Sequence, residues 1–296
     1  MLINNQFNED KILSPAQYVW FLFKQKTTAI AATWMAALFF AILLFAQYLM
    51  PHAPETQSIH NLLLPPYWLE GGNSSYVLGT DELGRDTLSR ILEGIQLTLG
   101  AALLVTFIIT SIGILLGSLA ASFKGLASSI LHHLLDVILA IPTLLLALII
   151  IVILGASFEN CLYAITISLV PQFAQGMFTS IENEMKKLHI TALRLDGASN
   201  IQLLRYGVYP NIKEPVITLI SHAFSMVVLE ITTLGFLGFG VQSYSSELGS
   251  LISANLNLIY LSPTLIIAPG IAIFLIVFTS NVLAEGIRHS ILQGDE

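Results

Sequence analysis

The sequence predicts an all-α integral membrane protein with six transmembrane helices. Of its 296 residues, 55% are hydrophobic and only 10% are charged, whereas soluble domains carry about 25% charged residues. Long stretches contain no Asp, Glu, Lys or Arg, and a membrane-spanning helix needs about 20 consecutive apolar residues. Too little polar surface remains to cover a soluble globule, so the composition argues against a soluble enzyme.

The six predicted spans follow the stretches that lack charge. The third and fifth spans are each interrupted by one acid, Asp136 and Glu230. The last charge-free stretch, residues 249–284, is too long for one helix, and the Ser and Asn residues in its first part place the final span at its end. The predicted spans are 28–50, 95–121, 128–154, 160–180, 215–238 and 264–284.

The distribution of Lys and Arg predicts the orientation. With the N-terminus inside, ten of the twelve cations fall in cytoplasmic segments, where such residues are enriched. The two exceptions, Arg85 and Arg90, lie among acids in the first outer loop. We therefore expect both termini in the cytoplasm, with 1–27 as the N-terminal segment, 28–288 as one membrane domain and 289–296 as the tail.

The first outer loop ends in LGTDELGRDTLSRILEG, residues 78–94. The spacing predicts an amphipathic helix, with Thr80 as its N-cap, that leads into the second span. Asp81 with Arg85 and Asp86 with Arg90 would form pairs of opposite charge, four residues apart, on a helical face. Exposed pairs contribute little to stability, so a self-neutralised interfacial helix remains the alternative to a functional motif. The residues singled out are Gly79, Thr80, Asp81, Gly84, Arg85, Asp86 and Arg90.

The large cytoplasmic loop, residues 181–211, contains two short helical patterns on either side of Gly197. Gly197 can adopt the left-handed conformation that ends a helix. Ser199 or Asn200 can cap the second helix, and Pro210 stops it. Two interpretations stay open: a rigid projection that binds a soluble partner, or two helices that lie on the membrane surface.

Asp136 and Glu230 are the notable side chains inside the predicted spans. Ionisable residues at bilayer depth are rare and usually face the bundle interior or water. One interpretation places them on a translocation path or at a contact between subunits. The other is a structural acid that is protonated, hydrogen-bonded or close enough to the interface to reach water.

The sequence lacks the motifs typical of nucleotide-binding proteins, hydrolases and metal-binding proteins. No G-x-x-x-x-G-K-[ST] loop occurs, so the chain is not expected to bind ATP or any other cofactor itself. No protease or lipase motif and no paired-cysteine metal motif is present, and we expect no metal site. The net charge of −7, without a basic stripe, argues against nucleic acid as a partner.

Four segments resemble permeases of the dipeptide, oligopeptide and nickel group of binding-protein-dependent ABC transporters. They occur in the family's order as LGTDELGRDTLSRILEG, LDVILAIPTLLLALI (135–149), TALRLDGASNIQLLRYGVYPN (191–211) and TLGFLGFGVQ (233–242). The runs LLLPPYW (62–68) and RLDGAS (194–199) are most similar to the Sap-type peptide permeases of this group. That branch is linked to antimicrobial-peptide resistance.

The resemblance implies that the cytoplasmic loop is a coupling loop that docks on an ATPase. Ala192 and Gly197 match the family's Glu-Ala-Ala…Gly pattern, whereas Thr191 stands where Glu is common and Asp196 where Leu is usual. The residues expected to couple transport to ATP hydrolysis are Thr191, Ala192, Arg194, Asp196, Gly197, Ser199 and Pro210.

The resemblance also implies the partners of a whole transporter. These are a second permease subunit, two cytoplasmic ATPase subunits and a periplasmic solute-binding protein, assembled in the lipid of a bacterial inner membrane. Peptides are the expected solute, and another solute such as a polyamine, haem or a metal chelate, or export in place of uptake, is the alternative. A membrane scaffold that recruits a soluble partner is the alternative from a different class.

Overall fold

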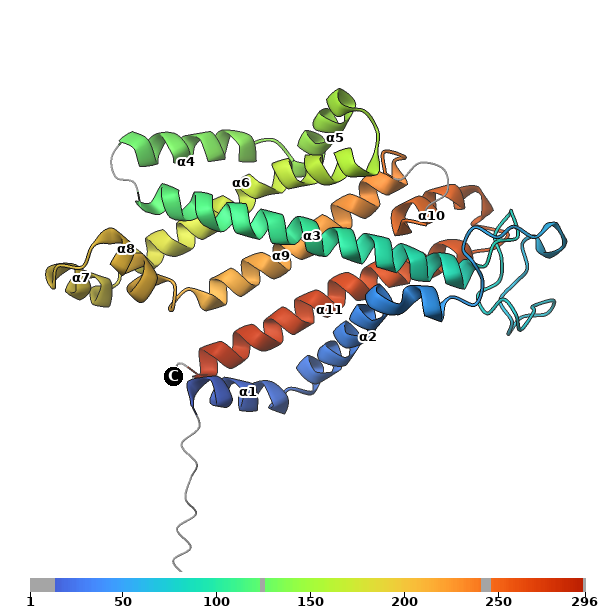
Figure 1. Ribbon diagram of the computed structural model, residues 1–296, viewed down its shortest axis with the longest axis horizontal. Coiled ribbons are helices and arrows are strands. Elements are labelled where there is room, and N and C mark those ends of the chain that lie inside the picture. Colours follow the sequence, from blue (N-terminus) through green and yellow to red (C-terminus); the bar gives the residue numbers. More distant parts are fainter. Residues whose placement is uncertain (1–13, 123–125, 241–245, 295–296) are drawn as a thin grey trace, which may run out of the picture.

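The computed structural model describes residues 14–122, 126–240 and 246–294, and it contains helices and loops but no strand within them. Five of its helices are long and apolar enough to cross a membrane. They are α2 (Thr27–Leu49), α3 (Thr87–Ser122), α6 (Phe158–Met185), α9 (Lys213–Phe236) and α11 (Thr264–Gly294). These helices run along the long axis of the molecule (Figure 1). The predicted all-helical membrane fold is confirmed.

The third predicted span, 128–154, is wrong as a single helix. The chain instead forms α4 (Leu126–Leu139) and α5 (Thr143–Leu154), which are separated by a break before Pro142. Proline has no backbone N–H to continue the helix, and it disfavours helical geometry in the residue before it. Both helices pack against α6, so together they occupy the place of the predicted span.

Two further helices lie outside the predicted spans. Within the segment predicted only as a cytoplasmic N-terminus, α1 (Pro15–Gln25) begins with a capping box between Ser14 and Gln17 and packs against α11. After α9, the short helix α10 (Leu248–Ala254) packs against α3, α9 and α11. The final helix, α11, also continues ten residues beyond the predicted end at 284.

The remaining elements lie in the connections. The outer loop between α2 and α3 contains the short helix η1 (Ile59–Asn61), and η3 (Leu256–Leu258) follows α10. The cytoplasmic loop contains α7 (Leu188–Leu195), α8 (Asn200–Gln202) and the π-helical segment η2 (Leu203–Val208). Figure 1 places the outer loop at one end of the bundle and α7 and α8 at the other.

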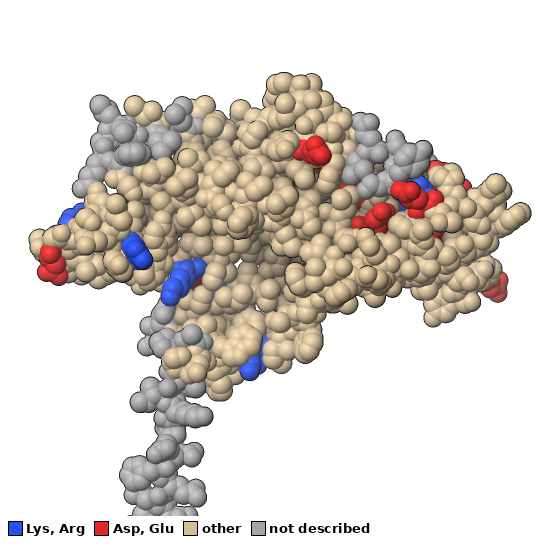
Figure 2. Space-filling view, in the orientation of Figure 1, with Lys and Arg blue, Asp and Glu red and all other residues tan. Residues whose placement is uncertain are grey.

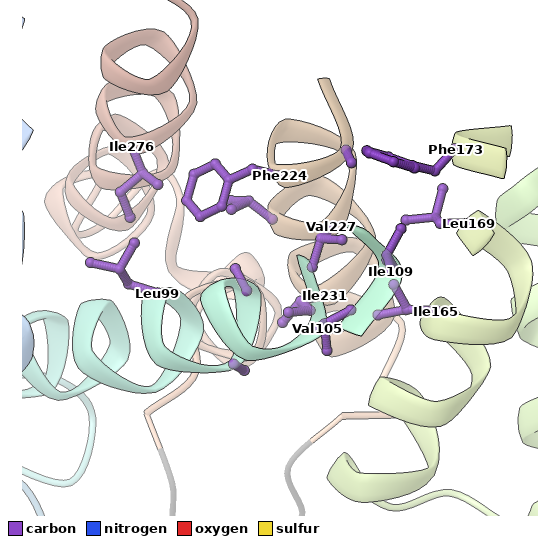
Figure 3. Close-up of a cluster of buried hydrophobic side chains, with 14 of the residues drawn as sticks. Leu99, Val105, Ile109, Ile165, Leu169, Phe173, Phe224, Val227, Ile231 and Ile276 are labelled. Carbon is purple, nitrogen blue, oxygen red and sulfur yellow. The ribbon is translucent and has the colours of Figure 1, made fainter. Parts of the chain in front are cut away.

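The core joins α3, α6, α9 and α11 through branched and aromatic side chains (Figure 3). The contact between α3 and α6 is especially close because two glycines of α3, four residues apart, face α6. A Cβ on Gly113 would lie 2.5 Å from the ring of Phe173, and one on Gly117 would lie 2.6 Å from Cβ of Met177. Small residues at this spacing let helix backbones approach closely in membranes.

A groove lies beside α9, toward α2 and α11. An apolar groove of about 420 Å³ lies between α2, α3, α9 and α11. Its walls include Phe40 of α2, Leu103 of α3, Phe224 of α9 and Ile276 of α11. All four helices are long and apolar enough to cross a membrane.

Candidate functional site

The outer-loop motif is a tight turn that packs against the preceding loop. Thr80 is not a helix N-cap: its hydroxyl donates to the carbonyl of Asn61 at 2.5 Å and accepts from the backbone N–H of Leu64 at 2.9 Å. Gly79 and Gly84 both have positive φ angles, and a Cβ on either would lie within about 2.2 Å of a carbonyl oxygen of the preceding loop. The turn therefore requires glycine at both positions.

Asp81 is the centre of this turn. Its side chain is 2% exposed. One carboxylate oxygen accepts from the backbone N–H groups of Leu83 and Arg85, both at 2.9 Å. The other accepts from Arg85 Nε at 2.7 Å and from Arg90 Nη1 at 2.8 Å. The predicted exposed helix face is thus replaced by a buried cluster in which one acid pairs with two arginines.

The predicted pair between Asp86 and Arg90 is wrong because Asp86 instead caps α3. Its Oδ2 accepts from both the backbone N–H and the hydroxyl of Ser89, at 3.2 and 2.5 Å. An acid at this position also complements the positive end of the helix. The helix therefore begins at Thr87, later than the sequence predicts, and Arg90 is left to reach back to Asp81.

The same cluster continues into the connection between α9 and α11, which sequence reasoning missed. Arg90 Nε donates to Ser246 Oγ at 3.3 Å. The next residue, Glu247, is fully buried, and its carboxylate caps α10 by accepting from the N–H groups of Gly249 and Ser250, both at 2.8 Å. Burial raises the pKa of Glu247 to about 7, although these backbone bonds oppose the shift.

The two acids of the predicted spans have different environments. Asp136 lies on an exposed face of α4, and His133 Nδ1 is 3.9 Å from its carboxylate. Glu230 is only 4% exposed and lies inside the packing of α9. The hydroxyls of Thr143 on α5 and Ser168 on α6 interact with it, but neither carboxylate oxygen reaches hydrogen-bonding geometry within the described residues.

The cytoplasmic loop folds into a compact projection. After α7, Gly197 adopts φ +87°, and no atom lies within 4 Å of the point where a Cβ would stand, so the turn itself is the reason for glycine there. Ser199 then forms a capping box with Gln202, which occupies both side chains. Gln202 is thus part of the turn, not a free surface residue.

The tip of this projection is apolar and exposed. Leu188 is 88% exposed, Leu195 85% and Ile201 77%. The residues predicted for coupling all lie in this loop and are exposed, and Gly197 contributes only backbone. They are Thr191, Ala192, Arg194, Asp196, Gly197, Ser199 and Pro210. The structure thus leaves the predicted coupling residues accessible on the loop, and their role in coupling stays a prediction.

Charge is distributed unevenly along the molecule. Figure 2 shows most Lys and Arg side chains toward the end that carries α7 and α8, and most Asp and Glu side chains toward the opposite end. Basic residues are enriched on the cytoplasmic side of membrane proteins. The two sites therefore lie at opposite ends of a polarised bundle.

Two family models match parts of the chain. Residues 113–292 match the family described as "Binding-protein-dependent transport system inner membrane component". Residues 14–66 match the "N-terminal TM domain of oligopeptide transport permease C". Among solved structures, the chain resembles the inward-facing MetNI methionine ABC transporter with a TM-score of 0.57 at 16% identity, over 68% of this chain and 96% of that one. This likeness shows the fold alone.

Curated relatives match over the full length. The chain is 36% identical to the peptide transport system permease protein SapC of Escherichia coli O6:H1, over 100% of both chains. It is 33% identical to the dipeptide transport system permease protein DppC of Escherichia coli K12, over 97% of this chain and 98% of the relative. With these matches, the chain belongs to the family of binding-protein-dependent ABC transporter permeases of the inner membrane.

Proposed function

We propose that this chain is one permease subunit of an ATP-driven importer that moves peptides across a bacterial inner membrane. The observation that carries the proposal is the apolar tip of the cytoplasmic loop. Three large side chains at this tip are exposed on a projection beyond the spanning helices, and such surfaces mark sites of protein contact. The names of the relatives, which are peptide and dipeptide permeases, support a peptide solute.

We assign the apolar tip to docking on a cytoplasmic ATPase. The loop joins α6 to α9, and both helices belong to the core. A force applied to the tip when two ATPase subunits close on ATP would therefore act directly on two spanning helices. Thr191, Ala192, Arg194, Asp196 and Ser199 would contact the ATPase, and Gly197 and Pro210 would fix the shape of the loop.

The remaining partners follow from this assignment. A second permease would complete the path through the membrane, and a periplasmic binding protein would deliver the solute to the outer end. This arrangement requires both termini in the cytoplasm, which the distribution of basic residues supports. ATP hydrolysis would belong to the ATPase subunits, and the permease itself would bind no nucleotide because it has no phosphate-binding loop.

We place Glu230 and Asp136 along the translocation path or at the contact with the second permease. Glu230 lies where α5, α6 and α9 meet, so a movement of α5 would expose it. Glu230→Gln should keep the complex assembled but alter peptide transport or its coupling to ATP. Wild-type transport by Glu230→Leu would contradict this role, because that variant removes every polar atom of the side chain.

The proposed function can be tested with the complete transporter. The chain is co-expressed with its companion permease, ATPases and binding protein, and the complex is reconstituted into vesicles. We expect uptake of a labelled peptide that requires both ATP and the binding protein. Failure of any ATPase to co-purify would contradict the coupling role, and uptake of a polyamine, haem or a metal chelate but no peptide would identify a different solute.

The link to antimicrobial peptides is a finer proposal. It is supported by the similarity to SapC and by the runs at 62–68 and 194–199. A strain that lacks this permease should be more sensitive to cationic antimicrobial peptides, and the wild-type gene should restore resistance. Unchanged sensitivity would leave the protein as a nutrient peptide permease.

A further inference from the structure

The cytoplasmic loop has two limbs, α7 and the segment from α8 to Asn211, and a buried acid of α6 contacts the first of them. Glu184, near the end of α6, is buried although it carries an ionisable carboxylate. Its Oε2 lies 2.7 Å from Nζ of Lys187, at the start of α7. Its Oε1 lies 3.3 Å from Nε2 of His189, in the first turn of α7. Glu184 thus connects a core spanning helix to the first limb of the loop.

The second limb reaches the same histidine. Asn211, which follows η2, donates through Nδ2 to the carbonyl of Gly207 at 2.7 Å, and the same Nδ2 lies 3.4 Å from His189 Nε2. The limbs are also packed closely, because a Cβ on Gly207 would lie 2.6 Å from Cδ1 of Ile190. A change in the hydrogen bonds of His189 therefore affects both limbs.

One nitrogen atom, His189 Nε2, lies between an acceptor and a donor. When this nitrogen carries a proton, it can donate to Glu184 Oε1. When it carries none, it can accept from Asn211 Nδ2 but leaves Glu184 Oε1 without a hydrogen bond. The two bonds exclude each other, since a ring nitrogen either donates or accepts.

Several other charged groups near the loop have partners of their own, and no ion pair joins Arg194, Asp196 or Lys213 to His189 or Glu184 in the described residues. Glu182 pairs with Lys186 at 3.1 Å on the outer surface of α6. Arg205 of η2 lies over the ring of Tyr206 at 5.5 Å, and Glu214 of α9 pairs with Arg288 at 3.5 Å. In the described part of the chain, the charged groups that contact His189 or its acid are therefore Glu184 and Lys187.

We infer that His189 is a positioning residue of the coupling loop: protonation at Nε2 decides whether its ring binds Glu184 at the end of α6 or Asn211 after η2. The inference rests on the coupling role proposed above. Histidine changes charge between about pH 5 and 8. Coupling between peptide delivery and ATP hydrolysis should then depend on cytoplasmic pH.

The test uses the complete transporter in vesicles, with peptide-stimulated ATP hydrolysis measured at the ATPase side between about pH 5 and 8. We expect the stimulation to change by about two- to tenfold, the effect of one net hydrogen bond on an equilibrium. His189→Gln, which does not titrate, should flatten this response. His289→Gln, a matched change on α11 outside the coupling loop, should preserve it.

A second variant covers the case in which His189→Gln does not assemble. Asn211→Asp adds a negative charge beside the ring and should move the midpoint of the response to higher pH. An unchanged midpoint in Asn211→Asp, or an unchanged profile in His189→Gln, overturns the inference. If the wild-type complex shows no ATP hydrolysis stimulated by binding protein and peptide, the proposed coupling function itself fails, and the inference fails with it.

Discussion

Gly197→Val tests the coupling loop at a position where the energetic penalty of the substitution has a single source, the backbone conformation. Gly197 has φ +87°, and no atom lies within 4 Å of the position of an added Cβ. The penalty is therefore confined to the backbone, at about 1–2 kcal/mol for an L-residue in the left-handed region. An energy of this size changes a conformational equilibrium by about 5- to 30-fold. The variant should leave the permease inserted but tilt α7 against α8.

The assay measures two quantities on reconstituted complexes: the ATPase retained on pull-down of the permease, and the peptide transported per ATP hydrolysed. Gly155→Val is the matched control, because Gly155 has φ +91° and equally open surroundings but ends α5 at the opposite end of the bundle. We expect Gly197→Val to lower one or both quantities and Gly155→Val to lower neither. Equal values for Gly197→Val and wild type would refute the reasoning.

Three other predictions concern the outer end and the topology. Folding raises the pKa of Glu247 from 4.5 to about 7. Its contribution to the free energy of unfolding should therefore be fully present below about pH 4.5 and fall by about 3 kcal/mol as pH rises through 7. Thermal unfolding in detergent should show this loss in wild type but not in Glu247→Gln. Arg90→Gln should lower the free energy of unfolding by about 2 kcal/mol, because Asp81 loses one charged hydrogen bond but keeps the others. An unchanged melting temperature would argue against a buried cluster. An impermeant thiol reagent should label Ser74→Cys from the outside and Asn183→Cys only after permeabilisation, both positions being exposed; the reverse pattern would invert the topology.

The spanning helices could be predicted because the bilayer imposes one simple requirement, a long apolar stretch without charge. Five of the six predicted spans correspond to single helices. The third does not, although Pro142 was visible in the sequence. Proline is tolerated as a kink in membrane helices, and only the packing of α4 and α5 against α6 decides between a kink and a break.

The outer cluster shows where local pattern fails. The spacing fits two helical pairs, Asp81 with Arg85 and Asp86 with Arg90. A tight turn instead brings Asp81 and Arg90 together, although they are nine residues apart. Two glycines with positive φ select the turn. Glu247 could not be found from the sequence, because its burial depends on helices that are distant along the chain.

The cytoplasmic loop was more predictable because its signals are local. Gly197 and Ser199 act on neighbouring residues, and the structure has the expected left-handed turn and N-cap. The link from Glu184 through His189 to Asn211 spans 27 residues of sequence and leaves no periodic signal. Contacts of this kind depend on how the two limbs of the loop fold back on each other, which no local pattern encodes.

The glycines of α3 have a mechanical consequence. At Gly113 and Gly117 the backbone of α3 lies against side chains of α6 with no room for a methyl group, so the two helices cannot slide or rotate past each other without a clash. The two helices should therefore move as one rigid unit. The groove between α2, α3, α9 and α11 has the opposite property, because it leaves about 420 Å³ into which side chains can shift. A movement of the cytoplasmic loop should therefore displace α3 and α6 together, and side chains that line the groove can shift to accommodate it.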